Sequence, residues 1–217
     1  MQPGRLPGGR HPRRRSRNWN VMGVTAMLAP LTHRPSPARV ALHAHLMAHA
    51  AGTPSDELLA HLVAGWTLGE GMLPADLGLG AERFAALMAR HFPGLTWRPS
   101  ADLAPRPELF PEFDDLLRFL AAEADPAVPG AGDLALIVAT GCMGAEHLWQ
   151  DLGLPSRREL SQLFALGFPA LARANDRDMK WKKFLYRELC QRDGIYVCSS
   201  PSCEACSDFK LCFGPEV

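Results

Sequence analysis

The sequence predicts an all-α fold, a helical bundle that carries an irregular, cysteine-rich metal-binding loop near its C-terminus. Apolar residues recur at helical spacing from about Pro37 onward, whereas strand-like patterns are confined to the short segments IVATGC and GIYVC. Four cysteines fall within residues 198–212, with almost nothing apolar between them. The chain has 217 residues, 47% of them hydrophobic, which is enough to bury one core.

The N-terminal segment differs in composition from the rest, and residues 1–21 are expected to be a disordered extension rich in Arg, Pro and Gly. It carries six arginines and no acidic residue, so the remainder has 17 basic and 23 acidic residues. We favour a start codon assigned too far upstream, with Met22 or Met27 as the beginning, over a flexible tail or a basic arm for nucleic acid. Residues 22–217 are then expected to form a single domain.

A first helical half is predicted over about residues 37–93. The segment TPSDELLAHLVAGW opens with Thr53 as a candidate N-cap and Pro54 at the first helical position. An apolar stripe follows, made of Leu58, Leu59, Leu62, Val63 and Trp66. The same period recurs in AERFAALMARHF, which indicates a further helix with one buried face.

A second helical half is predicted over about residues 110–194, after a Pro-rich segment, 94–111, that we expect to be a stiff connection. Its first helix is expected in FPEFDDLLRFLAAEA and its second over residues 133–151. Ser156 is the predicted N-cap of a third helix, in PSRRELSQLF. The last helix is expected to run from about residue 169 to residue 192.

The clustered cysteines indicate a metal site rather than a set of disulfides, which would spread along the chain to join distant elements. Cys198, Cys203, Cys206 and Cys212 have the spacing Cys-x4-Cys-x2-Cys-x5-Cys. Four-cysteine zinc sites usually pair two Cys-x-x-Cys turns, and only one is present here. The first three cysteines match the plant-type ferredoxin order. The spacing therefore favours an iron–sulfur cluster, with zinc as the alternative.

Two further cysteines stand apart from this cluster. Cys142 and Cys190 lie within helical patterns, where a lone cysteine is usually a small buried hydrophobe. Cys190 is the better candidate for an additional ligand, because it lies only eight residues before Cys198.

Basic residues surround the apolar face of the predicted last helix, in MKWKKFLYRELC. They are Lys180, Lys182, Lys183 and Arg187. These cations would offset the negative charge of a thiolate cluster, and Lys182 and Lys183 are candidates to receive an oxyanion. The alternative is a solvated basic face.

Four of the eight histidines are considered as ligands, in two groups. His147 opens the segment HLWQDLGL, where a structural hydrogen bond or a metal contact would explain it, and Glu146 and Asp151 could serve either purpose. The other group is His43, His45 and His49. His45 and His49 have the i, i+4 spacing of a helical metal pair, but we expect them to be exposed histidines of an alanine-rich helix.

Five segments in the same order make the chain similar to the NifQ family of nitrogen-fixation proteins. They are HLWQDLGL, RRELSQLF, FPALARAND, MKWKKFLYRELC and CSSPSCEACSDFKLCFGPE. Upstream, GMLPADLGLGAERFAALMARHFPG resembles the N-terminal helical half of that family. The Arg-rich start is not part of the family pattern.

The resemblance implies a carrier rather than an enzyme. Proteins of this family hold an iron–sulfur cluster, of 4Fe–4S or 3Fe–4S type, and supply molybdenum for the iron–molybdenum cofactor of nitrogenase. The family motif maps onto Cys198, Cys203, Cys206 and Cys212. The implied partners are the scaffold complex NifEN and the nitrogenase iron protein, with molybdate as the input, in the cytoplasm of a diazotrophic bacterium.

Other classes of function have less support in the sequence. No phosphate-binding loop or nucleotide motif is recognisable, and the apolar run LALIVATGCMG is about half the length of a membrane-spanning helix. The 23 basic and 23 acidic residues cancel, which argues against nucleic acid or a membrane surface as partner. Two alternatives remain, a zinc-stapled helical interaction protein and an iron–sulfur sensor or regulator.

Overall fold

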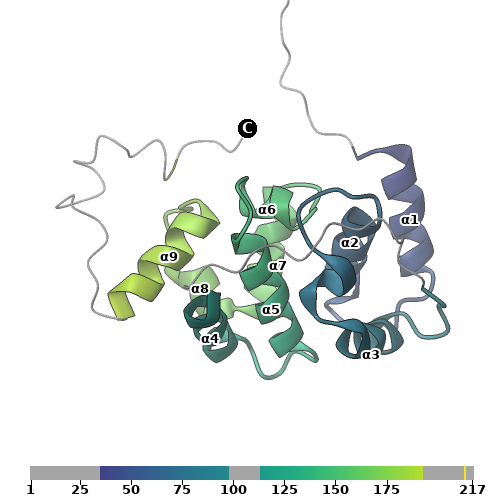
Figure 1. Cartoon of the computed structure of the whole chain (residues 1–217), viewed down its shortest axis with the longest axis horizontal. Helices are drawn as coiled ribbons and strands as arrows, with labels where there is room; N and C mark the ends of the chain where they lie inside the picture. Colours follow the sequence, from purple (N-terminus) through teal and green to yellow (C-terminus); the bar gives the residue numbers. More distant parts are fainter. Residues whose placement is uncertain (1–34, 98–112, 193–212, 214–217) are drawn as a thin grey trace, which may run out of the picture. The chain divides into compact units, whose positions relative to one another are not determined.

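The computed structural model describes residues 35–97, 113–192 and 213, all within the unit that begins at His33. In these segments every regular element is a helix (Figure 1), which confirms the all-α prediction there. The elements are α1 (Pro37–Met47), α2 (Asp56–Thr67), η1 (Ala75–Gly78), α3 (Ala81–His91), α4 (Phe113–Glu123), α5 (Ala131–Cys142), α6 (Leu148–Asp151), α7 (Arg157–Gly167), α8 (Pro169–Ala174) and α9 (Trp181–Arg192). The predicted cysteine loop, 198–212, lies outside the described residues, as do GIYVC and most of the predicted Pro-rich connection.

Short-range capping explains where several helices begin. Ser36 precedes α1, and its hydroxyl accepts a hydrogen bond from the amide of Arg39 at 3.2 Å. The predicted cap of α7 is confirmed, since Ser156 accepts from the amide of Arg158 at 3.1 Å. Its hydroxyl also donates to the Glu159 carboxylate at 2.6 Å.

The predicted start of α2 is wrong, because the helix begins at Asp56 with Ser55 in the cap position. Asp56 reaches back instead, and its carboxylate accepts from the amides of Thr53 at 2.8 Å and Gly52 at 2.7 Å. The ring of His91, at the end of α3, lies 2.8 Å from the same carboxylate. Burial alone would raise the pKa of Asp56, but these hydrogen bonds together lower it. The start of α2 is thereby tied to the end of α3.

Two helices predicted as continuous are each divided in the structure. The segment 133–151 forms α5 and the short α6, with a break around Gly144. The segment 169–192 forms α8 and α9, separated by a turn in which Asp178 has a φ of 53°. The Asn175 side chain holds that turn, accepting from the amide of Met179 at 2.8 Å and donating to its carbonyl at 2.9 Å.

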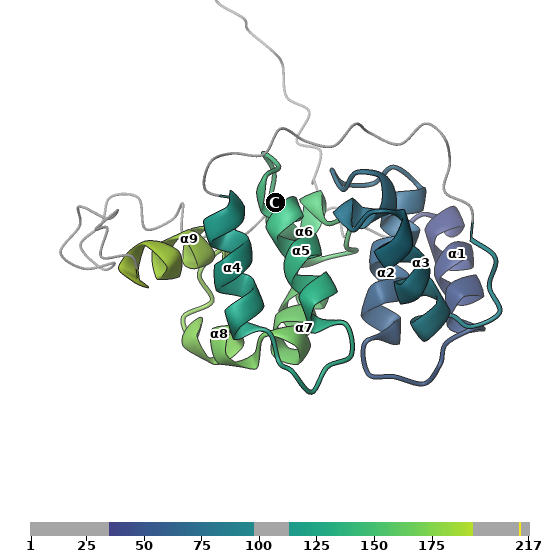
Figure 2. The same ribbon diagram turned by 60° about the horizontal axis from the view of Figure 1, so that its bottom comes forward.

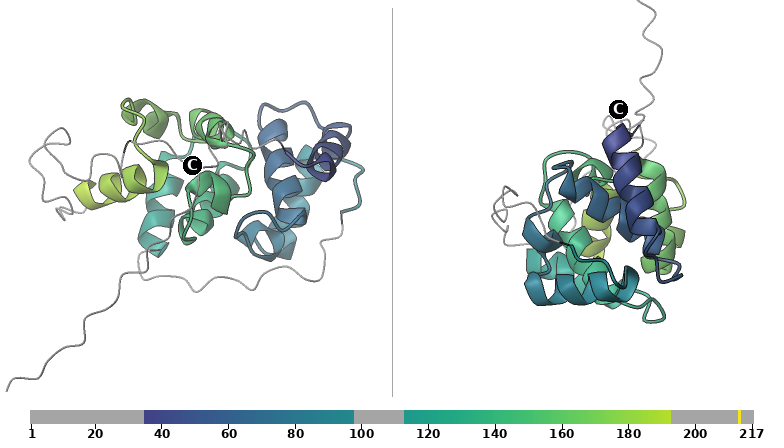
Figure 3. Two further views of the ribbon diagram at one scale, coloured as in Figure 1. Left: turned by 90° about the horizontal axis from the view of Figure 1, so that it is seen from above. Right: turned by 90° about the vertical axis from the view of Figure 1, so that its right-hand side faces the viewer.

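The helices pack on one another in sequence-local pairs that are joined by a few longer-range contacts. α1 packs on α2, α4 on α5 and α7 on α8, as Figures 2 and 3 show from further sides. α4 also contacts α8 and α9, α5 contacts α6 and η1, and α7 contacts both α6 and α2. The α2–α7 contact joins the two predicted helical halves.

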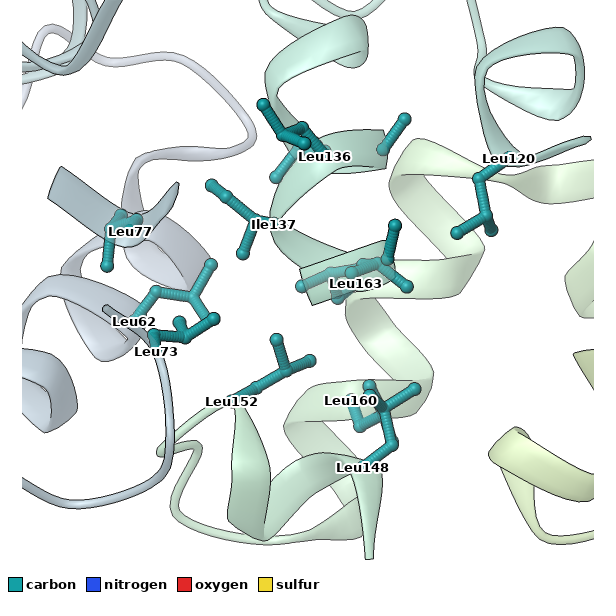
Figure 4. Close-up of a cluster of buried hydrophobic side chains, with 14 of the residues drawn as sticks. Leu62, Leu73, Leu77, Leu120, Leu136, Ile137, Leu148, Leu152, Leu160 and Leu163 are labelled. Atoms are coloured by element: carbon teal, nitrogen blue, oxygen red, sulfur yellow. The ribbon is translucent and has the colours of Figure 1, made fainter. Parts of the chain in front are cut away.

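Both halves contribute to one hydrophobic core. Figure 4 shows Leu62, Leu73 and Leu77 of the first half close to Ile137 and Leu152 of the second. All five side chains are buried. The predicted stripe of α2 is confirmed as well, since each of its five apolar residues is buried.

The strand-like segment IVATGC is part of α5 rather than a strand. Every residue from Leu134 to Cys142 is buried, so the run is apolar on all sides and shows no helical period. A short, fully buried run cannot be assigned to strand or helix from periodicity alone. No helix within residues 35–97 or 113–192 has both the length and the apolar character that crossing a bilayer requires.

Candidate functional site

The four predicted ligand cysteines, Cys198, Cys203, Cys206 and Cys212, lie outside the described residues. Residues on both sides of this cysteine segment are described. α9 ends at Arg192, six residues before the first cysteine. Phe213, directly after the last, packs against the core, with the Arg177 guanidinium 5.2 Å from its ring centroid. Arg192 at the end of α9 and Phe213 beside Arg177 are thus the described residues on either side of the segment.

An open pocket of about 230 Å³ lies where the start of α9 meets the loop before α6. Its lining residues are Ala145, Glu146, His147, Leu148, Lys180, Lys182 and Lys183. The structure therefore brings together three of the predicted site residues, His147, Lys182 and Lys183, although the lysines lie 35 and 36 positions after the histidine.

The side chain of Lys182 is held by contacts with other residues of the protein. Its ammonium group forms an ion pair with the Asp151 carboxylate and donates to the Gly144 carbonyl at 2.7 Å. Asp151 is buried, and it also accepts from the amide of Glu146 at 3.1 Å. Burial raises the pKa of Asp151, while the hydrogen bond and charge of Lys182 oppose that rise. These contacts give Lys182 and Asp151 a structural role, holding the loop between α5 and α6 against α9.

Lys180 and Lys183 differ from Lys182 because neither forms an ion pair with any side chain in the described part of the chain. Lys180 is half-buried just before α9, and Lys183 is exposed on its first turn. The three lysines, together with Glu146 and Asp151, leave a net charge of about +1 at the pocket. A pocket this open and this weakly charged attracts an oxyanion only modestly, since water and salt screen the attraction.

His147 occupies the N-cap position of α6. The side-chain oxygen of Gln150 accepts from the His147 amide at 3.2 Å, and the two residues form a capping box. The His147 ring is half-buried and lines the pocket. The capping box gives His147 a structural role, and its predicted metal contact stays a prediction.

The two separate cysteines lie in different environments. Cys142 is buried at the end of α5, and burial raises the pKa of its thiol to about 12, so it stays protonated and unreactive. Cys190 is half-buried on the last turn of α9 and is a free thiol. The prediction of a small buried hydrophobe is therefore confirmed for Cys142, while Cys190 stays a candidate ligand.

The predicted helical histidine pair is not assembled into a metal site. His45 is exposed on α1, and the Nδ1 of His49 lies 3.1 Å from the His45 carbonyl. The two rings meet edge-on, with centroids 5.1 Å apart. His43 instead faces α2, where it meets Glu57 and His61. This group is not among the residues predicted from the sequence, although the i, i+4 spacing of Glu57 and His61 is a signal for it.

Comparison with known proteins identifies the family. The model of the NifQ family matches residues 58–214. Protein NifQ of Rhodobacter capsulatus is 45% identical over 148 residues, which cover 68% of this chain and 81% of that protein. Protein NifQ of Azotobacter vinelandii is 43% identical over 157 residues, covering 67% of this chain and 80% of that protein. No solved structure matches the chain. The match spans most of the chain and includes all four clustered cysteines, and the chain therefore belongs to the NifQ family, which indicates a role in nitrogen fixation.

Proposed function

We propose that this chain is an iron–sulfur protein that binds molybdenum and delivers it for the biosynthesis of the nitrogenase iron–molybdenum cofactor. The observation that carries the proposal is the family match, which extends through residue 214 and so contains the whole four-cysteine segment. A carrier binds its metal and then releases it, and it needs no catalytic residues for either step. We therefore propose that the chain is not an enzyme.

The donor set fits the proposed cofactor. Cys198, Cys203, Cys206 and Cys212 supply four thiolates within fifteen positions, and thiolates are the ligands that hold iron–sulfur clusters. Sulfide and thiolate are also the soft ligands that molybdenum must acquire before it enters a sulfur-rich cofactor. A cluster bound here would supply sulfide for that purpose.

The lysine pocket is the proposed entry point for molybdate. Lys180 and Lys183 are the cations available to it, while Lys182 keeps the pocket in shape through Asp151. The pocket lies at the start of α9, the helix that leads into the cysteine segment. The net charge of about +1 supports weak and reversible capture, which suits an ion that is passed on.

The proposed partners are the cofactor-assembly scaffold NifEN and the nitrogenase iron protein, and the proposed compartment is the bacterial cytoplasm. A zinc-stapled interaction protein remains the second candidate function, because four cysteines also suit Zn²⁺. An iron–sulfur sensor has no separate support among the described residues.

A reconstituted cofactor synthesis tests the proposal. The chain, purified without oxygen from cells supplied with molybdate, is offered as the sole molybdenum source to NifEN and the iron protein. We expect active cofactor from the parent and none from Cys203→Ala/Cys206→Ala, because the double variant lacks half of the thiolate ligands. Cys142→Ala, which removes a buried thiol outside the motif, is the matched control and is expected to retain donation.

The same experiment separates the pocket from the cluster. Lys180→Gln/Lys183→Gln is expected to keep its iron and lose about half or more of its molybdenum, since only the oxyanion attraction is removed. Full molybdenum content in this variant would exclude the pocket. Failure of the parent to donate, with zinc bound in place of iron, would favour the structural staple.

A further inference from the structure

His43, Glu57 and His61 form a cluster between α1 and α2 that the proposed function does not use. Glu57 and His61 are one helical turn apart on α2, and His43 faces them from α1. Each residue offers one ligand atom, and the three atoms all lie within 4.8 Å of one another. Two ligands that share one tetrahedral Zn²⁺ ion, at bond lengths of about 2.0–2.2 Å, lie about 3.4 Å apart. Closure around an ion therefore needs the ligand atoms to approach one another by up to about 1.4 Å.

Two nitrogen atoms in this cluster are buried without a hydrogen-bond partner in the described structure. They are the Nε2 of His43 and the Nδ1 of His61. A buried polar atom with no partner destabilises the fold, and such atoms usually have an explanation. A metal ion would satisfy them, since a neutral imidazole coordinates through its free nitrogen.

The imidazole rings stack, with centroids 4.0 Å apart and planes 20° from parallel. Burial lowers the pKa of both histidines, that of His61 to about 4, so both are neutral and have lone pairs to offer near neutral pH. The stacked planes must open for both lone pairs to reach one ion. Rotation about the terminal side-chain torsion of histidine permits this, because that torsion has broad energy minima.

The charges around the cluster tolerate a cation. Arg39 is the positive charge that acts on both rings, and it is paired with Glu70. Its second guanidinium nitrogen donates to the carbonyls of His61 at 3.1 Å and Gly153 at 2.6 Å. Glu57 faces the rings, and Glu159 of α7 acts on His61 with a further negative charge.

We propose that His43, Glu57 and His61 bind a divalent transition-metal ion such as Zn²⁺, which joins α1 to α2. Two imidazoles and one carboxylate are a donor set typical of Zn²⁺ and Fe²⁺, and Mg²⁺ and Ca²⁺ prefer oxygen ligands throughout. Glu57 is exposed, so a metal ion can reach the site from solvent and a water molecule can complete the coordination. His43 and Glu57 precede the residues that match the family, 58–214, so this site does not follow from the family resemblance.

Co²⁺ binding to the full-length chain tests the site, because Co²⁺ accepts the same ligands as Zn²⁺ and its visible absorption reports their geometry. Thiolate ligands add a charge-transfer band in the near ultraviolet, so binding at the cysteines is recognised separately. We expect the spectrum of the Co²⁺-loaded parent to contain a component that lacks the thiolate band and therefore comes from Co²⁺ bound outside the cysteines. His43→Ala/His61→Ala is expected to lose this component and to keep its iron and molybdenum content.

Two further variants control the experiment. His45→Ala/His49→Ala also removes two imidazoles, from α1 and the turn after it, and is expected to bind Co²⁺ as the parent does. Glu57→Gln changes only an exposed side chain and is expected to weaken Co²⁺ binding about tenfold or more.

Two results would overturn the proposal. One is a parent that shows only the thiolate component. The other is equal Co²⁺ affinity in the parent, in Glu57→Gln and in a correctly folded His43→Ala/His61→Ala. Should circular dichroism show that the double variant is unfolded, an unchanged affinity in Glu57→Gln decides against the site. A loss of iron in the cysteine variant alone bears on the proposed function and leaves this site unaffected.

Discussion

The ammonium group of Lys182 shows how one contact limits what a charged side chain can do. The basic run in MKWKKFLYRELC suggested that any of its lysines could receive an oxyanion. Lys182 instead pairs with Asp151, which lies 31 positions earlier in the chain, and both side chains are largely removed from water. A buried pair is weak evidence for added stability, but breaking it leaves a buried charge behind.

Replacing Lys182 with Met is therefore expected to lower the free energy of unfolding by about 3 kcal/mol near neutral pH. Lys183→Met, on the exposed side of the same helix turn, is the matched control and is expected to change it by less than about 0.5 kcal/mol. Urea denaturation of both variants measures the difference. Equal stability would mean that the pair does not hold the loop.

The same variant has a pH dependence of predictable sign. Burial already raises the pKa of Asp151, and removing Lys182 takes away the interaction that opposes this rise. The folded variant then binds a proton that the unfolded chain releases, so its stability increases as the pH falls from about 7 to about 5. The difference in free energy of unfolding between the variant and the parent should therefore shrink over that range. A difference that stays constant with pH would mean that the lost stability does not come from Asp151.

At the scale of the element, the break between α5 and α6 depends on a close approach that only glycine allows. A Cβ atom at Gly144 would lie 2.3 Å from the Asp151 carboxylate, well inside any permitted contact. The carbonyl of Gly144 also accepts the hydrogen bond from Lys182. The glycine thus lets the chain turn tightly around Asp151.

Gly144→Ala is expected to destabilise the protein by about 2 kcal/mol, because the added methyl group must displace a buried carboxylate. Gly132→Ala is the matched control. It lies near the start of α5, where a Cβ meets nothing within 4 Å, and is expected to be neutral or to stabilise by up to about 1 kcal/mol. Thermal unfolding of the two variants measures the contrast. A Gly144→Ala protein as stable as the parent would show that the loop has room to move.

Helix periodicity predicted most of the elements, since the apolar stripes of α2, α3, α7 and α9 are buried as expected, and that of α4 is buried apart from the half-buried Leu117. It missed both helix breaks for the same physical reason. Gly144 and Asn175 end helices through contacts with residues four to seven positions later, and a count of apolar residues contains no information on such contacts. Residues 134–142 of α5 are all buried and have no polar face to reveal their period, which is why IVATGC was a strand candidate within a segment predicted to be helical.

At the scale of the whole molecule, the described helices of both predicted halves share one core, and the candidate site lies where distant segments meet. Sequence alone identified His147, Lys182 and Lys183 as separate candidates, and the fold brings them to one pocket. The sequence could not show that the charge of Lys182 is neutralised there, because only the fold brings Asp151 to it. The cysteine motif was recognisable because its ligands are close in sequence and need no fold to bring them together.

The central claim is that Cys198, Cys203, Cys206 and Cys212 hold an iron–sulfur cluster on which molybdenum is carried. Elemental analysis of iron, molybdenum, zinc and acid-labile sulfide, on protein purified without oxygen from molybdate-fed cells, tests it most directly. We expect iron and sulfide in cluster proportion together with molybdenum, all lost in Cys203→Ala/Cys206→Ala and retained in Cys142→Ala. Zinc in the parent without sulfide, lost in the same double variant, would contradict the claim.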